Sequence, residues 1–121
     1  MEQLTTNRQG RILELAMLTK KVNLKLSSSE LKSLVMLMQH YFIHRPLICM
    51  DDKQRVFQIY MLYEKKIRPK QLQLKSKFML RLDMSQASAL FGMFRDMELE
   101  GYPYEQNLCY YITREIDHQT A

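Results

Sequence analysis

The sequence predicts a mainly helical α+β domain in which two paired strands are covered by four helices. Three observations support this fold class: an alternating apolar segment, a second segment that repeats it, and a capping box after each one. We expect one domain of 121 residues with two β-α-α units, at about 19–68 and 71–118, related by a pseudo-two-fold axis. A composition of 46% apolar and 26% charged residues fits a globular domain of this size.

The central segment, residues 71–82, alternates between large apolar and polar side chains. This period of two is typical of a β-strand with one face against a core and the other in water. We therefore expect five apolar side chains of this segment to be buried: Leu72, Leu74, Phe78, Leu80 and Leu82.

An internal repeat relates this segment to an earlier part of the chain. KVNLKLSSSELKSLV and KFMLRLDMSQASALF align without a gap at an offset of 56 residues. Each copy starts with alternation and continues into a capping box, which pairs Ser27 with Glu30 in the first copy and Asp83 with Gln86 in the second. We expect each copy to fold as a strand that leads directly into a helix.

The remaining helices of the first unit follow from spacing and prolines. Apolar side chains recur on one helical face over residues 28–44, and the proline at position 46 disfavours helical geometry just before it. Asp51 or Asp52 is expected to cap a second helix, which should stop before Pro69.

In the second unit, Gly101 is predicted to close the third helix in a left-handed conformation. Pro103 suits the start of a fourth helix, which should run to about Asp117. Gly92 lies in the middle of the third helix, where glycine is a poor helix former. We therefore expect a neighbouring backbone to approach closely there.

The N-terminal end has a less regular pattern. Residues 1–10 are predicted to be disordered, and RILELAMLTKK, which follows them, fits both a helix and an extension of the first strand. We expect a short helix or irregular start that becomes strand by about Thr19.

Basic residues are concentrated in one part of the chain. The formal net charge is +5, and residues 65–81 hold seven of the 18 Lys and Arg residues but no Asp or Glu. Such a segment is typical either of a solvated surface or of a site for an anionic partner. If nucleic acid is the partner, these side chains would neutralise its phosphates: Lys65, Lys66, Arg68, Lys70, Lys75, Lys77 and Arg81.

Residues 77–102, KFMLRLDMSQASALFGMFRDMELEGY, resemble the second and third helices of winged helix-turn-helix repressors. In this resemblance a recognition helix starts at Met84 and ends near Gly101 and Tyr102, which implies DNA binding through that helix. The resemblance also requires KFMLRL to be helical, against its alternation.

The preferred interpretation of function is a small, non-catalytic binding or assembly module that self-associates. A two-stranded sheet has two open edges, to which a second copy can add its own strands. The seven tyrosines and ten methionines suit a contact surface, although they also fit a Met-rich core. We predict contact with another copy or a protein partner through five tyrosines: Tyr60, Tyr63, Tyr104, Tyr110 and Tyr111.

Candidate groups for chemistry are few, and we predict neither enzyme activity nor a cofactor. The three glycines form no phosphate-binding loop. His40 and His44 are four residues apart and are candidate metal ligands, but histidines near a helix end also favour the helix dipole. Cys49 and Cys109 lack CxxC partners and are expected to be reduced, with a disulfide between them left open.

No apolar run approaches the roughly 18 residues that a membrane-spanning helix needs, and the N-terminus has no export signal. We therefore expect a cytoplasmic protein without a membrane partner.

Overall fold

Two antiparallel strands and a set of helices make up the part of the chain that this computed structural model describes, residues 20–44 and 49–120. The fold is mainly helical α+β, as predicted, while the predictions for residues 1–10 and Thr19 lie outside the described residues. The elements are β1 (Lys21–Ser27), α2 (Ser28–His44), α3 (Met50–Leu62), the π-helical turn η1 (Tyr63–Ile67), α4 (Arg68–Gln71), β2 (Lys77–Asp83), α5 (Met84–Asp96) and α6 (Pro103–Thr120).

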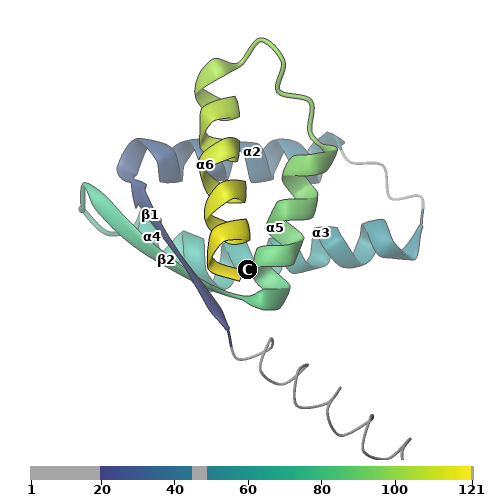
Figure 1. Cartoon of the computed structure of the whole chain (residues 1–121), viewed down its shortest axis with the longest axis horizontal. Coiled ribbons are helices and arrows are strands. Elements are labelled where there is room, and N and C mark those ends of the chain that lie inside the picture. The colour runs from purple at the N-terminus through teal and green to yellow at the C-terminus, as the bar shows by residue number, and fades with distance from the viewer. Residues whose placement is uncertain (1–19, 45–48, 121) are drawn as a thin grey trace, which may run out of the picture.

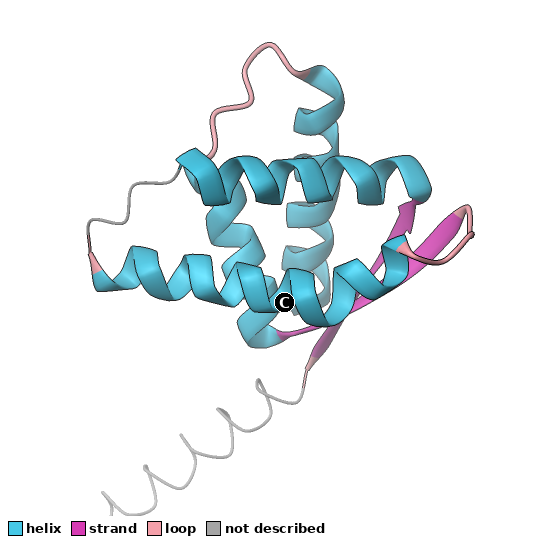
Figure 2. Cartoon of the chain, turned by 180° about the vertical axis from the view of Figure 1, so that it is seen from behind, coloured by secondary structure: helices cyan, strands magenta, loops and turns pink. Residues whose placement is uncertain are grey.

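The helices lie in two crossed layers beside the sheet (Figures 1 and 2). One layer contains α2 and the continuous helix α3–η1–α4, and the other contains α5 and α6. The segment α3 packs mainly on α5, whereas α6, α2 and α5 contact the strands directly. The described residues therefore contain the four predicted helices, but α3 lies against other helices rather than over the sheet.

The sheet pairs the two alternating segments in antiparallel register. Leu24 lies opposite Leu80 at the centre of the pair, and the odd-numbered side chains face solvent except for the half-buried Ser27 and Asp83 at the strand ends. Burial of the even-numbered side chains confirms the period of two over residues 21–26 and 77–82. These side chains form the sheet's contribution to the core: Val22, Leu24, Leu26, Phe78, Leu80 and Leu82.

Both predicted capping boxes are confirmed. The backbone N–H of Glu30 donates to Ser27 Oγ over 3.1 Å, and the Ser27 N–H donates to Glu30 Oε1 over 2.9 Å. In the second copy the Gln86 N–H donates to Asp83 Oδ1 over 2.7 Å, and the Asp83 N–H donates to Gln86 Oε1 over 3.0 Å. The last residue of each strand is therefore also the N-cap of the helix that follows.

The strand prediction for residues 71–76 is wrong, because β1 ends at Ser27, which pairs with Lys77. Residues before Lys77 have no strand of the sheet beside them and form a loop after α4. Leu72 and Leu74 are consequently 82% and 105% exposed, instead of buried.

The second helix differs from its prediction at both ends. Its N-cap residue is Cys49, so Asp51 and Asp52 lie in the first turn, where their charges favour the helix dipole. The helix also continues through Pro69 to Gln71 instead of stopping before the proline. The π-helical turn η1 ends two residues before Pro69, and its wider turn accommodates a residue that lacks a backbone N–H.

The two glycines of the second half have other roles than predicted. The left-handed conformation predicted for Gly101 is confirmed by its φ of 87°, but the residue lies in the turn before α6 rather than at the end of α5, which ends at Asp96. Gly92 is approached by a side chain instead of a backbone. A Cβ atom at Gly92 would lie 2.8 Å from the Nε atom of Arg55.

Candidate anion-binding groove

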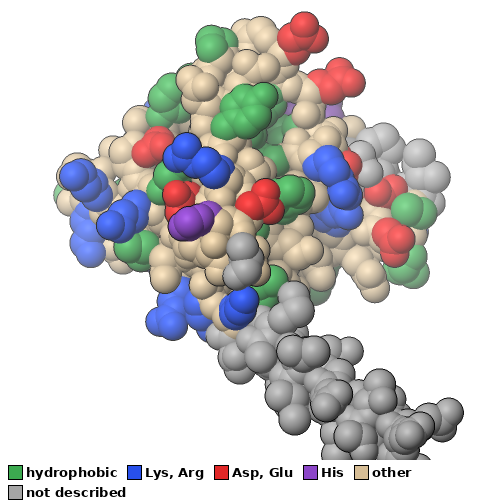
Figure 3. Space-filling model, in the orientation of Figure 1, with side chains coloured by type: hydrophobic (Ala, Val, Ile, Leu, Met, Phe, Trp, Pro, Cys, Tyr) green, Lys and Arg blue, Asp and Glu red, His purple; other side chains and the backbone are tan. Residues whose placement is uncertain are grey.

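A groove of about 390 Å³ beside β2 is lined by five basic side chains. Its walls come from both strands, η1, α4 and the loop before β2. Figure 3 shows Lys and Arg side chains gathered around the strands, at the left and lower edges of that view. No acidic or aromatic residue is among the eight that line the groove, so it suits phosphate groups better than stacked bases. The lining residues are Lys21, Lys65, Lys66, Pro69, Lys70, Gln73, Met79 and Arg81.

Local sequence patterns explain why these cations meet. Lys21 and Arg81 occupy odd positions of β1 and β2, so both belong to the solvent face of the sheet. On the helical side, Ile67 is fully buried and fixes η1 against the core. Lys65 and Lys70 lie on either side of this anchor along the helix, at the wall of the groove.

Lys66 connects the helical wall to the sheet. Its Nζ atom donates to the backbone oxygen of Arg81 over 2.6 Å and to Gln86 Oε1 over 2.7 Å. Burial lowers the pKa of Lys66, and the charges of Lys21, Arg81 and Lys70 lower it further, against the opposing effect of Asp83. Lys66 therefore holds η1 to β2 and to the capping box of α5, within a positive potential set by its neighbours.

The structure brings together four of the seven predicted basic residues. Lys65, Lys66, Lys70 and Arg81 line the groove, and Lys21 joins them from the other strand. Lys21 could have been noticed in the sequence from its place in the repeated alternating segment. Only the strand pairing, however, shows that it lies beside the basic residues of segment 65–81.

The other three predicted basic residues do not line the groove. Arg68 forms an exposed ion pair with Glu64 on the same helix, with 3.1 Å between Arg68 Nη1 and Glu64 Oε2. Lys75 and Lys77 are exposed on the loop before β2 and at the first position of that strand.

Side chains of α6 cover the outer edge of β1, whereas the sequence predicted an open edge. The Asn23 N–H donates to Gln119 Oε1 over 2.7 Å, and Gln119 Nε2 donates to the Asn23 oxygen over 2.8 Å. The hydroxyl of Tyr111 donates to the Lys25 oxygen over 2.9 Å. These contacts take the place of a neighbouring strand and oppose dimerisation through this edge.

The five predicted contact tyrosines do not share one environment. Tyr111 is tied to β1, the Tyr104 hydroxyl lies 3.2 Å from Ser29 Oγ, and Tyr63 is half-buried against the core. Tyr60 and Tyr110 are 48% and 73% exposed, but they lie on α3 and α6, which belong to different layers.

His40 and His44 face each other, with 4.3 Å between their ring centroids. Within residues 20–44 and 49–120, no group of three or more His, Cys, Asp or Glu side chains lies close enough to hold a metal ion. Cys49 is exposed and Cys109 is half-buried, and both are free thiols rather than a disulfide. In the same ranges, no helix combines the length and apolar character needed to cross a bilayer.

The structure contradicts the helix-turn-helix resemblance, because KFMLRL forms strand β2 where the motif requires a helix. The following helix α5 also buries Ala89 and Gly92, which a recognition helix would present to DNA.

Comparisons with known proteins give no further guidance: no family model, curated protein or solved structure matches the chain.

Proposed function

We propose that the protein is a non-catalytic binding module whose groove takes a phosphate-bearing anionic partner. The observation that supports this is the convergence of five cations from β1, η1, α4 and β2 on one groove without a lining carboxylate. Lys21 and Arg81 are 60 positions apart in the sequence, so the cluster is a product of folding and not only of a local basic run.

The electrostatics of the groove favour a bound anion. Burial lowers the pKa of Lys66, and repulsion from the charges of Lys21, Arg81 and Lys70 lowers it further, against the opposing effect of Asp83. A phosphate between the two walls would relieve this repulsion and form charge-assisted hydrogen bonds. We therefore expect binding that weakens steeply as salt is added.

The test compares the wild type with a groove variant that replaces Lys21, Lys65, Lys70 and Arg81 by alanine. Lys66 is kept because its hydrogen bonds hold η1 to β2. Anisotropy of a labelled mixed-sequence oligonucleotide, and competition by inorganic polyphosphate, measure binding over a range of salt concentrations. We expect the groove variant to bind more weakly, and the slope of its salt dependence to be smaller by about 0.9 for each phosphate that it no longer neutralises.

A matched control removes the same amount of charge elsewhere, by replacing four exposed residues outside the groove: Lys25, Lys32, Lys53 and Arg95. This variant should bind nearly as well as the wild type. Equal weakening in the two variants would show that only net charge matters. Absence of binding to both polymers would also overturn the proposal.

We also infer that the two β-α segments are related by a local two-fold axis. The repeat equates Leu24 with Leu80, and these two residues lie directly opposite each other in the sheet. Each segment continues through a capping box into a helix, which supports the relation.

As a second function we propose self-association through a helix face rather than through a strand edge. Phe57 and Tyr60 are 63% and 48% exposed on α3, and the ring centroid of Phe42 lies 6.0 Å from that of Tyr60. Exposed aromatic groups of this kind are enriched at protein contacts. Sedimentation velocity should show a dimer for the wild type and a monomer for Phe57→Asp. A wild type that stays monomeric at high concentration would contradict this proposal.

A further inference from the structure

The loop between α4 and β2 exposes two leucines next to the groove. Leu72 is 82% and Leu74 is 105% exposed, more than any other large hydrophobic side chain among the described residues. Such exposure to water is unfavourable for a leucine side chain, and transfer into apolar surroundings would lower its free energy. These two exposed side chains lie two residues apart in one short loop, and we call this loop with its leucines the apolar tip.

The loop is anchored at both ends, so its leucines are held away from the core. The Gln73 N–H donates to the Lys70 oxygen over 3.1 Å, and the Ser28 N–H donates to the Ser76 oxygen over 2.9 Å. Figure 2 shows this loop at the right-hand periphery of the molecule, beyond the ends of the strands. The apolar tip is therefore the outermost part of this side of the protein.

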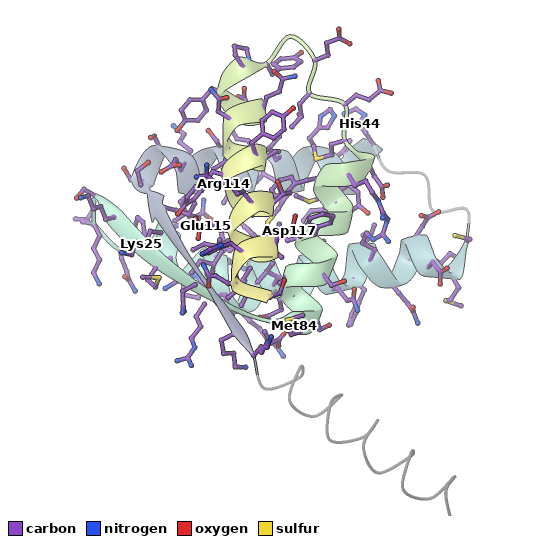
Figure 4. The ribbon with its side chains drawn as sticks, in the orientation of Figure 1. Lys25, His44, Met84, Arg114, Glu115 and Asp117 are labelled. Carbon is purple, nitrogen blue, oxygen red and sulfur yellow. The ribbon has the colours of Figure 1, made fainter. Side chains whose placement is uncertain are left out.

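Positive charge surrounds the tip. Gln73, which lies between the two leucines, also lines the groove, so the loop is one of its walls. Lys70, Lys75 and Lys77 flank the leucines in the chain, and no Asp or Glu occurs in residues 65–81. By contrast, the exposed side of α6 carries both signs of charge, including Arg114, Glu115 and Asp117 (Figure 4).

We propose that the groove and the loop of residues 72–76 dock on the surface of an anionic lipid bilayer. Leu72 and Leu74 enter the boundary between headgroups and acyl chains, while the lysines around them bind lipid phosphates. This inference rests on the proposed function, since the same groove binds phosphate. It adds that the phosphate belongs to a lipid headgroup.

A bilayer fits these features better than a nucleic acid does. Nucleic acid offers phosphates to the groove but no apolar layer for two aliphatic side chains, and the groove lacks the aromatic residues on which bases stack. The sequence-based expectation of no membrane partner considered only spanning segments and export signals. Surface docking needs only a few apolar side chains beside a basic patch.

The test is co-sedimentation of the full chain with phosphatidylcholine vesicles, with and without phosphatidylserine. We expect the wild type to bind only the anionic vesicles. The double variant Leu72→Ser/Leu74→Ser should bind them at least tenfold more weakly, because it lacks the two leucines that enter the bilayer. Both positions are almost fully exposed, so the variant should fold as the wild type does. Ile43→Ser, at another exposed apolar position (75%), is the matched control and should bind normally.

A second readout uses the absence of tryptophan from the chain. Leu74→Trp places a single indole at the tip, and its fluorescence should shift to shorter wavelength when anionic vesicles are added. Ile43→Trp should show no shift.

The outcomes separate this inference from the proposed function. If the leucine variant binds vesicles as well as the wild type, or if the wild type binds only the oligonucleotide, lipid docking is wrong and phosphate binding by the groove stands. If the wild type binds neither vesicles, oligonucleotide nor polyphosphate, both are wrong.

Discussion

Arg55 is the residue that most clearly links the two helical layers. Its side chain passes over Gly92 of α5, and its Nη1 atom lies 2.7 Å from Asp96 Oδ2, one turn further along the same helix. The two side chains are only 26% and 20% exposed, so solvent screens this pair less than a surface pair. Glycine at position 92 leaves the space that the guanidinium occupies.

Arg55→Ala is therefore expected to lower the free energy of unfolding by about 1 kcal/mol, because it removes both the ion pair and the packing of the side chain. Urea unfolding measures this change. The control is Arg68→Ala, which removes an exposed pair (61% and 31%) and should cost at most about 0.5 kcal/mol. Equal costs would contradict the structural role of Arg55.

Gly92→Ala tests the same contact from the other helix. In the Arg55→Ala background it should raise the free energy of unfolding by about 1 kcal/mol, because alanine is the better helix former. In the wild type most of this increase should be absent, since the added Cβ atom would lie 2.8 Å from Arg55 Nε. The same increase in both backgrounds would show that the two residues do not interact.

The two cysteines are expected to differ strongly in reactivity. Burial, with a smaller contribution from Glu105, raises the pKa of Cys109 from 9.0 to about 12, whereas Cys49 is exposed. Because the thiolate is the nucleophile, the Cys109 thiolate population falls about tenfold for each unit of pKa. Near neutral pH, a maleimide should modify Cys49 first, and Cys49→Ser should remove the fast reaction. Similar rates for both thiols would contradict the burial of Cys109.

The same shift affects stability at alkaline pH. Between pH 9.0 and about 12 the unfolded chain loses a proton that the folded protein retains, so the free energy of unfolding should fall as pH rises through this range. The fall should be smaller in Cys109→Ala.

Residue patterns predicted the local contacts and missed the distant ones. The capping boxes were correct because a cap is made by residues three apart, whose spacing is visible in the chain. The role of Gly92 was predicted incorrectly, because Arg55 reaches it from another helix. Lys21 was likewise absent from the predicted basic site, since its contact depends on strand pairing.

Among the elements, α6 has the most specific structural role, because it covers the free edge of β1. The amide of Gln119 forms two hydrogen bonds with the backbone of Asn23, as a neighbouring strand would. The α6 side chains thus occupy the backbone groups that a third strand would bind, and they oppose strand addition at this edge.

Gln119→Ala is expected to lower the free energy of unfolding by about 1–2 kcal/mol, because it leaves the Asn23 N–H and C=O without these partners. The exposed edge should also promote self-association, which light scattering at increasing concentration would detect. Asn107→Ala, at an exposed position of the same helix, is the control and should change neither property. A stable, unchanged Gln119→Ala variant would show that the edge needs no cover.

Element types could be predicted from periodicity, but some boundaries could not. Alternation extends over residues 71–82, yet β2 begins only at Lys77, because its partner strand β1 ends at Ser27, which is opposite Lys77. Proline likewise suggested an end at Pro69, whereas the π-helical turn before it lets the helix continue to Gln71. In both cases the deciding factor is a neighbour or a turn geometry that short-range patterns do not encode.

At the scale of the whole molecule, charge is unevenly distributed. Five cations meet at the groove beside β2, and the loop that forms one of its walls through Gln73 exposes two leucines. The exposed side of α6 carries charges of both signs (Figure 4). This asymmetry gives the protein one face suited to an anionic partner, and we expect binding at that face.

The most direct measurement is a titration of the isotope-labelled protein with inorganic tripolyphosphate, followed by the chemical shifts of its backbone amides. We predict that the largest shifts fall on the walls of the groove: on Lys21, on residues 65–73 and on Met79 to Arg81. Shifts that concentrate on α3 or α6, or that spread evenly over every exposed lysine, would contradict the account.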